Sequence, residues 1–225
     1  MIRAILNGGF TTDLLIELMA TTFVVFCVLP LHEYAHAWMA NRLGDDTARL
    51  AGRLTINPLK HLDLFGAILI FIAGFGYAKP VPVNPLKFKD SKKGMALTAA
   101  AGPAMNLILA FFFLLLSYIA ALFADPVEPY AVAGVAMSFF SYAAVVNISL
   151  AVFNLLPIPP LDGSRIATLF LPRDLYFKIM QYERYMIYIL YALLIFGGLD
   201  SLLSFFVGLI YNGMDFLISL PFRLF

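Results

Sequence analysis

Residues 29–44 read LPLHEYAHAWMANRLG, and they place two histidines and a glutamate at the end of an apolar run that begins near Leu14. A helix needs about 20 apolar residues to cross a bilayer, and this run is long enough. Ionisable side chains are costly at membrane depth, so those found there usually serve a function. The stretch therefore predicts a membrane-spanning helix with a functional site near its end.

The composition extends this prediction to the whole chain. Of 225 residues, 62% are hydrophobic and 13% are charged, which is far from the balance of a soluble domain. We expect an all-α polytopic membrane protein with about four to six transmembrane segments. The formal net charge of +1 offers no basic surface for nucleic acid, and a single cysteine, Cys27, excludes an internal disulfide.

Four apolar blocks are long enough to cross a membrane, and they lie at about 14–40, 95–123, 131–156 and 185–219. The first block ends in histidines rather than in the small residues of a signal-peptide cleavage site, so we expect it to be retained. In the last block, Gly197, Gly198 and Asp200 indicate a break, which would allow a helical hairpin.

The domain organisation follows from the same blocks. No repeat or linker divides the chain, so we expect one integral domain over residues 1–225. Its core lies at about 14–165, and a C-terminal transmembrane block lies at about 185–219. The run 62–78 is shorter than the others and contains three glycines, which weaken a helix.

The segment TARLAGRLTINPL, residues 47–59, alternates polar and apolar side chains. This period is typical of a strand, so we expect a short membrane-associated β element after the first helix. In AKPVPVNP, residues 78–85, prolines at alternate positions exclude a helix and favour an extended path. For both segments the alternative is a plain surface connector.

The motif HEYAH gives the functional site a definite chemistry. His32 and His36 are four residues apart, so on a helix both imidazoles stand on one face and reach one metal ion. Glu33 lies beside them, where it can act on a metal-bound water. The alternative is a pair of helix histidines that are merely hydrogen-bonded in a core.

A catalytic zinc site needs a third protein ligand, and three residues are candidates. Cys27 precedes His32 by five residues, which rotates it off the metal face. His61, in NPLKHLD, fits a cap or an interfacial role at least as well. Asp162 is the strongest candidate, because prolines stop the preceding helix and hold this carboxylate in a rigid turn at membrane depth. Two neutral imidazoles, one carboxylate, Zn²⁺ and hydroxide also sum to zero charge, which limits the cost of burial.

Three motifs in order resemble those of the site-2 protease family of intramembrane zinc metalloproteases: HEYAH, AGPAMN at 101–106 and NLLPIPPLDG at 154–163. GRLTINPLKHLDLFG and AKPVPVN are similar to the short members of that family, which lack a PDZ domain. The resemblance implies one Zn²⁺ per chain and a catalytic acid/base. The implied metal ligands are His32, His36 and Asp162, and the implied acid/base is Glu33.

Two asparagines are assigned further roles. The resemblance implies that Asn154 holds the substrate or the developing oxyanion; alternatively, it caps the end of its helix near the prolines. We expect Asn106, in AGPAMN, to tie helices together rather than to touch substrate.

The implied function is hydrolysis of peptide bonds in or near transmembrane segments of membrane proteins. The partners would be those substrates and the lipid bilayer, with no nucleic acid. A zinc transporter is one alternative, but it needs ligands at more than one depth, and the expected spans contain no second cluster. A non-catalytic scaffold that binds membrane helices is another, but such a protein tends to have lost a ligand or the glutamate.

The charges around the first span predict its orientation. The basic residues that follow it are Arg42, Arg49, Arg53 and Lys60. By the positive-inside rule they place the HEYAH end at the cytoplasmic face. If residues 62–78 crossed the membrane, Asp162 would arrive at the opposite face from the histidines. We therefore expect 62–78 to re-enter or lie along the membrane, in a multi-pass protein of the cell membrane whose active site faces the cytoplasmic side.

Overall fold

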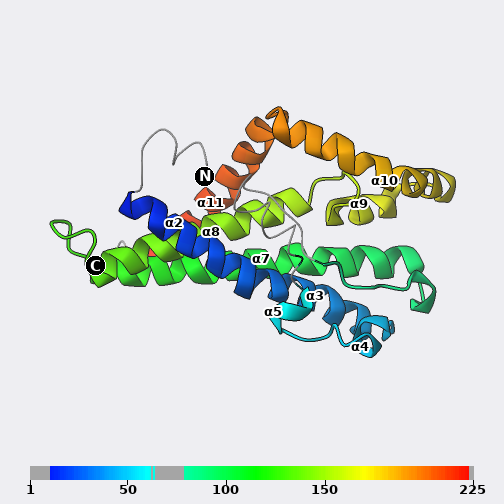
Figure 1. The fold of residues 1–225 in the computed structure, drawn as a ribbon, viewed down its shortest axis with the longest axis horizontal. Helices are drawn as coiled ribbons and strands as arrows, with labels where there is room; N and C mark the ends of the chain where they lie inside the picture. The colour runs from blue at the N-terminus through cyan, green and yellow to red at the C-terminus, as the bar shows by residue number, and fades with distance from the viewer. Residues whose placement is uncertain (1–10, 62, 64–78, 223–225) are drawn as a thin grey trace.

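The structure is a computed structural model that describes residues 11–61, 63 and 79–222. Helices make up the regular structure of these residues (Figure 1). In chain order they are α2 (Thr12–Phe23), η1 (Val24–Val28), α3 (Leu29–Arg42), α4 (Thr47–Leu50), α5 (Pro58–His61), η2 (Pro85–Lys87), α7 (Ser91–Ala121), α8 (Val132–Asn154), α9 (Asp162–Ala167), η3 (Thr168–Phe170), α10 (Arg173–Ile195) and α11 (Asp200–Phe222).

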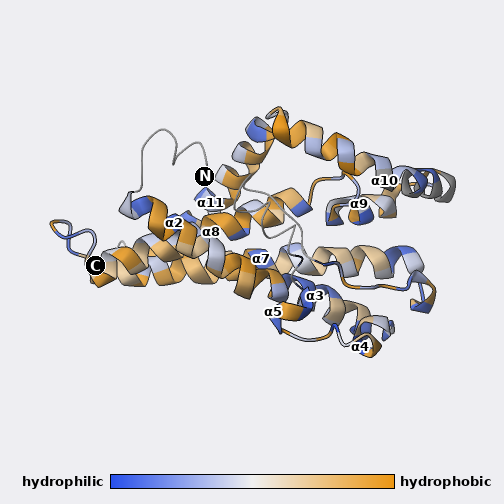
Figure 2. Cartoon of the chain, viewed as in Figure 1, coloured by the Kyte–Doolittle hydropathy of each residue, from blue (hydrophilic) through white to orange (hydrophobic). Residues whose placement is uncertain are grey.

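Four helices are long and apolar enough to cross a membrane. The first is the continuous helix Thr12–Arg42, in which the π-helical turn η1 joins α2 to α3, and the others are α7, α8 and α11. They overlap the four apolar blocks of the sequence, which confirms an all-helical, multi-span architecture for the described residues. Figure 2 shows hydrophobic residues along these helices and hydrophilic residues gathered around α4 and α9.

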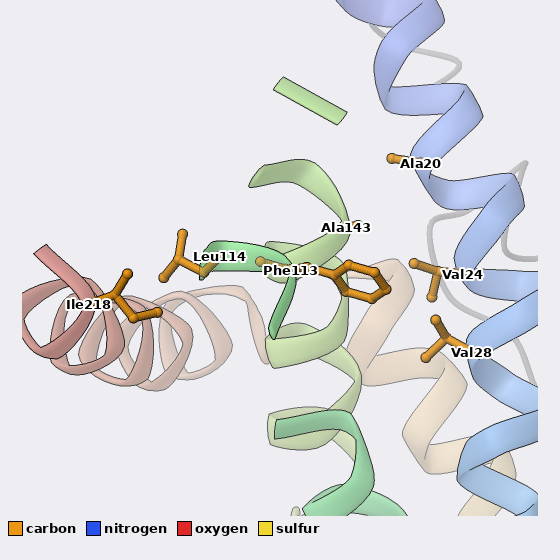
Figure 3. Packing of buried hydrophobic residues seen from close by; sticks show 8 residues of the cluster. Ala20, Val24, Val28, Phe113, Leu114, Ala143 and Ile218 are labelled. Atoms are coloured by element: carbon orange, nitrogen blue, oxygen red, sulfur yellow. The ribbon is translucent and has the colours of Figure 1, made fainter. Parts of the chain in front are cut away.

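The core of the helix bundle lies where the first span meets α7, α8 and the end of α11 (Figure 3). Its buried members are Ala20, Val24, Val28, Phe113, Leu114, Ala143, Ala144 and Ile218. The ring of Phe113 packs edge-on against Phe23, with centroids 5.8 Å apart. Alanines on the facing helices let the backbones approach closely, which is how membrane helices gain packing energy.

The C-terminal block is a pair of helices joined by a tight turn. α10 ends at Ile195, and the N–H of Gly198 donates to the Leu193 carbonyl, 2.8 Å away. Gly197 has φ of +70°, a conformation that glycine adopts without steric cost because it has no Cβ. α11 then begins at Asp200, so the break expected at residues 197–200 is confirmed.

The β element expected within residues 47–59 is wrong. Thr47–Leu50 form the helix α4, and Gly52 then turns the chain with φ of +66°. The helical turn begins here because the buried Asp45 carboxylate accepts hydrogen bonds from both the N–H and the hydroxyl of Thr47, at 3.0 and 2.5 Å. Such side-chain bonds favour a turn over a strand. The described part of the chain contains no strand.

The prediction for residues 62–78 falls outside the described residues. The residues on either side are described, and they meet: the N–H of Lys79 donates to the carbonyl of His61, 2.8 Å away. The end of α5 and the segment that starts at Lys79 therefore lie at the same place in the molecule.

Candidate metal centre

Two histidines of α3 bring their ring nitrogens together. His32 and His36 are one helical turn apart, and their Nε2 atoms lie 2.9 Å from each other. Both side chains are buried. The helical spacing anticipated from HEYAH thus places both imidazoles on one face of α3.

Asp162 lies beside this pair of histidines, although it is far from them in the sequence. It is the first residue of α9, and its Oδ2 lies 3.4 Å from His32 Nε2 and 3.3 Å from His36 Nε2. The turn that delivers it is packed directly on the end of α8, since a Cβ on Gly163 would lie only 2.1 Å from the Leu155 carbonyl oxygen. A glycine must therefore follow the aspartate for the carboxylate to reach the histidines.

The three ligand atoms fit a zinc ion. In a tetrahedral zinc site with bonds of about 2.0–2.2 Å, neighbouring ligand atoms lie roughly 3.3 Å apart. The distances from Asp162 Oδ2 to the two histidine Nε2 atoms match this value. The distance between the two Nε2 atoms, 2.9 Å, is slightly shorter. Asp162 Oδ2 is buried without a hydrogen-bond donor, as expected of an atom reserved for a cation. His32, His36 and Asp162 form the one potential metal-binding group found among the described residues.

The electrostatics keep the carboxylate ionised. Burial acts to raise the pKa of Asp162, but the adjacent His36 and His32 outweigh it and hold this pKa well below its usual range. Asp162 is therefore a carboxylate, the form that binds metal, throughout the physiological pH range.

Helix α7 forms the wall behind the two histidines and runs between α3 and α9 (Figure 1). His36 Nδ1 donates to the Thr98 carbonyl, 2.8 Å away, so in the neutral imidazole Nε2 is the nitrogen with a free lone pair. Gly102 lies one turn further along α7. A Cβ at this position would lie 2.4 Å from His36 Nε2 and 2.6 Å from His32 Cε1, so only glycine lets α7 pass.

Glu33 has a backbone partner beside the centre. Its carboxylate is buried, and Oε2 accepts a hydrogen bond from the N–H of Val81, 3.2 Å away. Val81 belongs to the proline-rich segment 78–85 that was expected to be extended, two residues after Lys79. The contact joins α3 to a segment 48 residues further along the chain.

Asn154 lies at the last residue of α8, close in sequence to the turn that carries Asp162. Its Nδ2 donates to the Leu150 carbonyl, 3.0 Å away, and this bond uses one of its two amide hydrogens. The side chain is half-buried. The observed bond is the helix-end contact of the alternative interpretation.

The remaining predicted residues lie apart from the three ligand atoms. Asn106 is wholly buried in α7, and neither of its amide atoms has a hydrogen-bond partner within the described residues. His61 is wholly buried and donates through Nε2 to the Thr55 carbonyl, 2.7 Å away. Cys27 is exposed in η1. Neither His61 nor Cys27 joins the metal-binding group.

Three residues of the site were not anticipated. Thr98 and Val81 act through backbone groups, so no side-chain pattern could have pointed to them. Gly102 lies in the AGPAMN motif, and the requirement for glycine there becomes clear only when the histidines face it.

A comparison with known protein families places this site in context. The model of the family described as "Peptidase family M50" matches residues 20–197, a range that includes both α3 and α9. The chain belongs to this family. The match confirms the resemblance to site-2 proteases that the sequence motifs predicted.

Relatives of this M50 member include named bacterial proteins. A Bacillus subtilis (strain 168) protein named "Putative zinc metalloprotease YwhC" is 45% identical over 179 residues, which cover 78% of each chain. Proteins named "Putative zinc metalloprotease Rip2" are 37% identical over 141 residues in Mycobacterium tuberculosis (strain H37Rv) and 34% identical over 140 residues in Mycolicibacterium smegmatis. These two matches cover 60% of this chain and 51%, about half, of the mycobacterial proteins. No solved structure matches the chain.

Proposed function

We propose that this M50 protein is an intramembrane zinc metalloprotease that hydrolyses peptide bonds in or near the transmembrane segments of membrane proteins. Its main support is the meeting of three ligand atoms, from His32, His36 and Asp162, at the spacing of a tetrahedral zinc site. The names of its relatives as zinc metalloproteases support the choice of metal. The apolar spans support a substrate that is itself embedded in the membrane.

Each residue of the centre has one task in this proposal. His32, His36 and Asp162 hold one zinc ion per chain, and such an ion acidifies a water molecule and polarises the scissile carbonyl. Glu33, of the HEYAH motif, accepts a proton from the attacking water and delivers it to the leaving nitrogen. Because Nδ1 of His36 donates to the Thr98 carbonyl, the neutral imidazole presents Nε2 to the metal.

Asn154 is proposed to bind the substrate near the reacting carbonyl. Its amide stands at the end of α8 with one hydrogen bonded to Leu150 and one left over. Donors that stabilise a developing oxyanion lower the barrier by roughly 3 kcal/mol. If Asn154 only ends its helix, Asn154→Ala will lower thermal stability and leave kcat/KM unchanged.

The proposal places the centre at the cytoplasmic face of the cell membrane and the whole of residues 1–225 in one membrane domain. The basic residues that follow α3 support this orientation. The meeting of His61 with Lys79 supports a different part of the proposal, that residues 62–78 do not cross the membrane, because the chain enters and leaves them at one place.

Glu33→Gln tests the proposal. The purified variant should bind one zinc ion per chain, as the wild type does, yet lose cleavage; membrane proteins that accumulate with it in cells are then recovered as substrates. His36→Ala should lose both zinc and cleavage. Full cellular function of Glu33→Gln, with no accumulating membrane protein, would show that the chain is a metal-binding or scaffold protein rather than a protease.

A further inference from the structure

Residues 79–84, called the brace here, run past Glu33 and are fixed in place by three buried polar residues outside the metal centre. The first of these is Asp45, whose side chain is fully buried. Its Oδ2 accepts a hydrogen bond from the N–H of Asn84, 2.6 Å away, while its Oδ1 is held by Thr47. This fixes the end of the brace.

Arg53 and His61 fix the beginning of the brace. The Arg53 guanidinium is almost completely buried, and its Nη2 donates to the carbonyl oxygens of Lys79 and Pro80. The His61 carbonyl accepts the Lys79 N–H, and the His61 ring is itself bound to the carbonyl of Thr55. Buried charges are costly unless they are paired or hydrogen-bonded, and the Asp45 and Arg53 side chains both bind the brace, while His61 binds it through its backbone carbonyl.

Val81 is the residue of the brace that faces the catalytic carboxylate. Its neighbours Pro80 and Pro82 have no N–H, so the Val81 N–H is the one donor in the middle of the brace. It donates to Glu33 Oε2, 3.2 Å away. With Oε2 engaged, the other oxygen of Glu33 is left for the attacking water.

We propose that the Val81 N–H is a positioning group for Glu33, and that Asp45, Arg53 and His61 serve this reaction by holding the brace; this rests on the proposed protease function. A glutamate side chain has three rotatable bonds, and an unrestrained carboxylate would often point away from the water it must deprotonate. The brace removes that freedom through one hydrogen bond to a charged acceptor.

Hydrogen exchange tests the contact itself without any activity. Within residues 80–82 Val81 alone has a backbone N–H, because both flanking residues are prolines, so the difference between overlapping peptides that end on either side of this stretch reports the Val81 amide. In the zinc-loaded wild type this amide should be protected, and in Glu33→Ala its exchange should be at least tenfold faster. Glu33→Gln keeps an acceptor oxygen and should retain protection. Equal exchange in the wild type and Glu33→Ala would overturn the proposal.

Kinetics with the substrate recovered from the Glu33→Gln trap test the effect on the reaction. Val81→Pro removes only the N–H from a segment that already favours an extended conformation, and it should lower kcat about tenfold or more, with KM and bound zinc unchanged. Val83→Pro makes the same change at a position whose N–H has no hydrogen bond to any of the residues that the structure describes, and it should leave kcat unchanged.

The outcomes separate the two proposals. Failure of the wild type to cleave any trapped protein contradicts the protease function. A wild type that cleaves, together with Val81→Pro at full kcat, contradicts the positioning role alone. Arg53→Lys keeps the charge but cannot reach both carbonyls of the brace. It should lower kcat, as Val81→Pro does, and retain zinc.

Discussion

Gly102 occupies the point where α7 comes closest to the metal ligands. A methyl group added to Gly102 would lie 2.4 Å from Nε2 of His36, the atom that faces Asp162. The His36 ring is held against this methyl group because its Nδ1 is hydrogen-bonded to the Thr98 carbonyl. We expect Gly102→Ala to lose stoichiometric zinc, measured by metal analysis of the purified protein, and with it all activity.

The matched control for this substitution is Gly208→Ala. Gly208 also lies in a membrane-spanning helix, α11, but nothing lies within 4 Å of a Cβ added there. This variant should keep its zinc and fold at least as well as the wild type, because alanine favours helix more than glycine does. Full zinc binding by Gly102→Ala would mean that α3 and α7 are not in register as described.

At the scale of single residues, the three side chains of the candidate metal-binding group could be singled out from the sequence, and the groups that support them could not. Three ionisable residues, His32, His36 and Asp162, stand out in apolar parts of the sequence, and their side chains are of the types that bind zinc. The supports from Thr98 and Val81 are peptide groups, which every residue possesses, so only a structure can select them. The exact use of Asn154 likewise depends on where its second amide hydrogen points.

Among the elements, α11 is held to the bundle by one polar contact as well as by packing. Tyr118 of α7 donates its hydroxyl hydrogen to Asp215 Oδ1, 2.6 Å away. A carboxylate in a spanning helix needs such a partner, and hydrogen bonds between membrane helices contribute about 1 kcal/mol. Tyr118→Phe should therefore lower the free energy of unfolding by about 1 kcal/mol, measured by denaturation in mixed detergent micelles.

Tyr188→Phe provides the comparison, because the Tyr188 side chain is 65% exposed on α10. Its loss of a hydroxyl should leave the unfolding free energy unchanged. Equal stability of the wild type and Tyr118→Phe would show that packing alone holds α11 in place.

The long helices followed from apolar block lengths, because length and hydrophobicity are local properties of the sequence. The segment 47–59 did not follow, because its alternation of side chains was outweighed by Asp45, which caps the turn at Thr47 and also binds Asn84. Asp45 is buried by a segment 39 residues away, and the residues next to Asp45 in the sequence do not indicate this contact. The pattern of residues 47–59 therefore favoured a strand that tertiary structure replaced with a helical turn.

For the molecule as a whole, the hydrogen bond between His61 and Lys79 has a topological outcome. Residues near α5 and those before α7 must share one side of the membrane, and α7 then carries the chain to the loop around Val127 on the other. In a Cys27→Ala background, an impermeant thiol reagent added to intact cells should label Val127→Cys and not Lys89→Cys; both positions are exposed. After permeabilisation, Lys89→Cys should be labelled too.

Labelling of Lys89→Cys in intact cells would reverse the orientation or require 62–78 to cross. In both cases Val127→Cys would become inaccessible from outside, because α7 lies between the two positions. A cysteine at the exposed Leu59, which precedes residues 62–78, distinguishes the two errors: Leu59→Cys reacts in intact cells only if the orientation is reversed.

Zinc removal should weaken the whole fold, because the ligands come from α3 and α9, elements that are far apart in the sequence. A metal that binds only the folded chain stabilises it by mass action. Chelation should lower the Tm of the wild type in detergent and leave the Tm of Asp162→Ala unchanged. An identical shift in both proteins would show that the chelator acts elsewhere.

The π-helical turn η1 has a consequence for the first span as a mechanical part. A π turn holds an additional residue, and each residue of an α-helix rotates the chain by about 100°. The turn therefore sets the angular phase between α2, which packs against α8, and α3, which packs against α7. One transmembrane span thereby consists of two helical parts that present different faces to the bundle: α2 packs in the core, and α3 carries the histidines. The five-residue turn η1 sets the rotation of α3, and so the direction in which the histidines point.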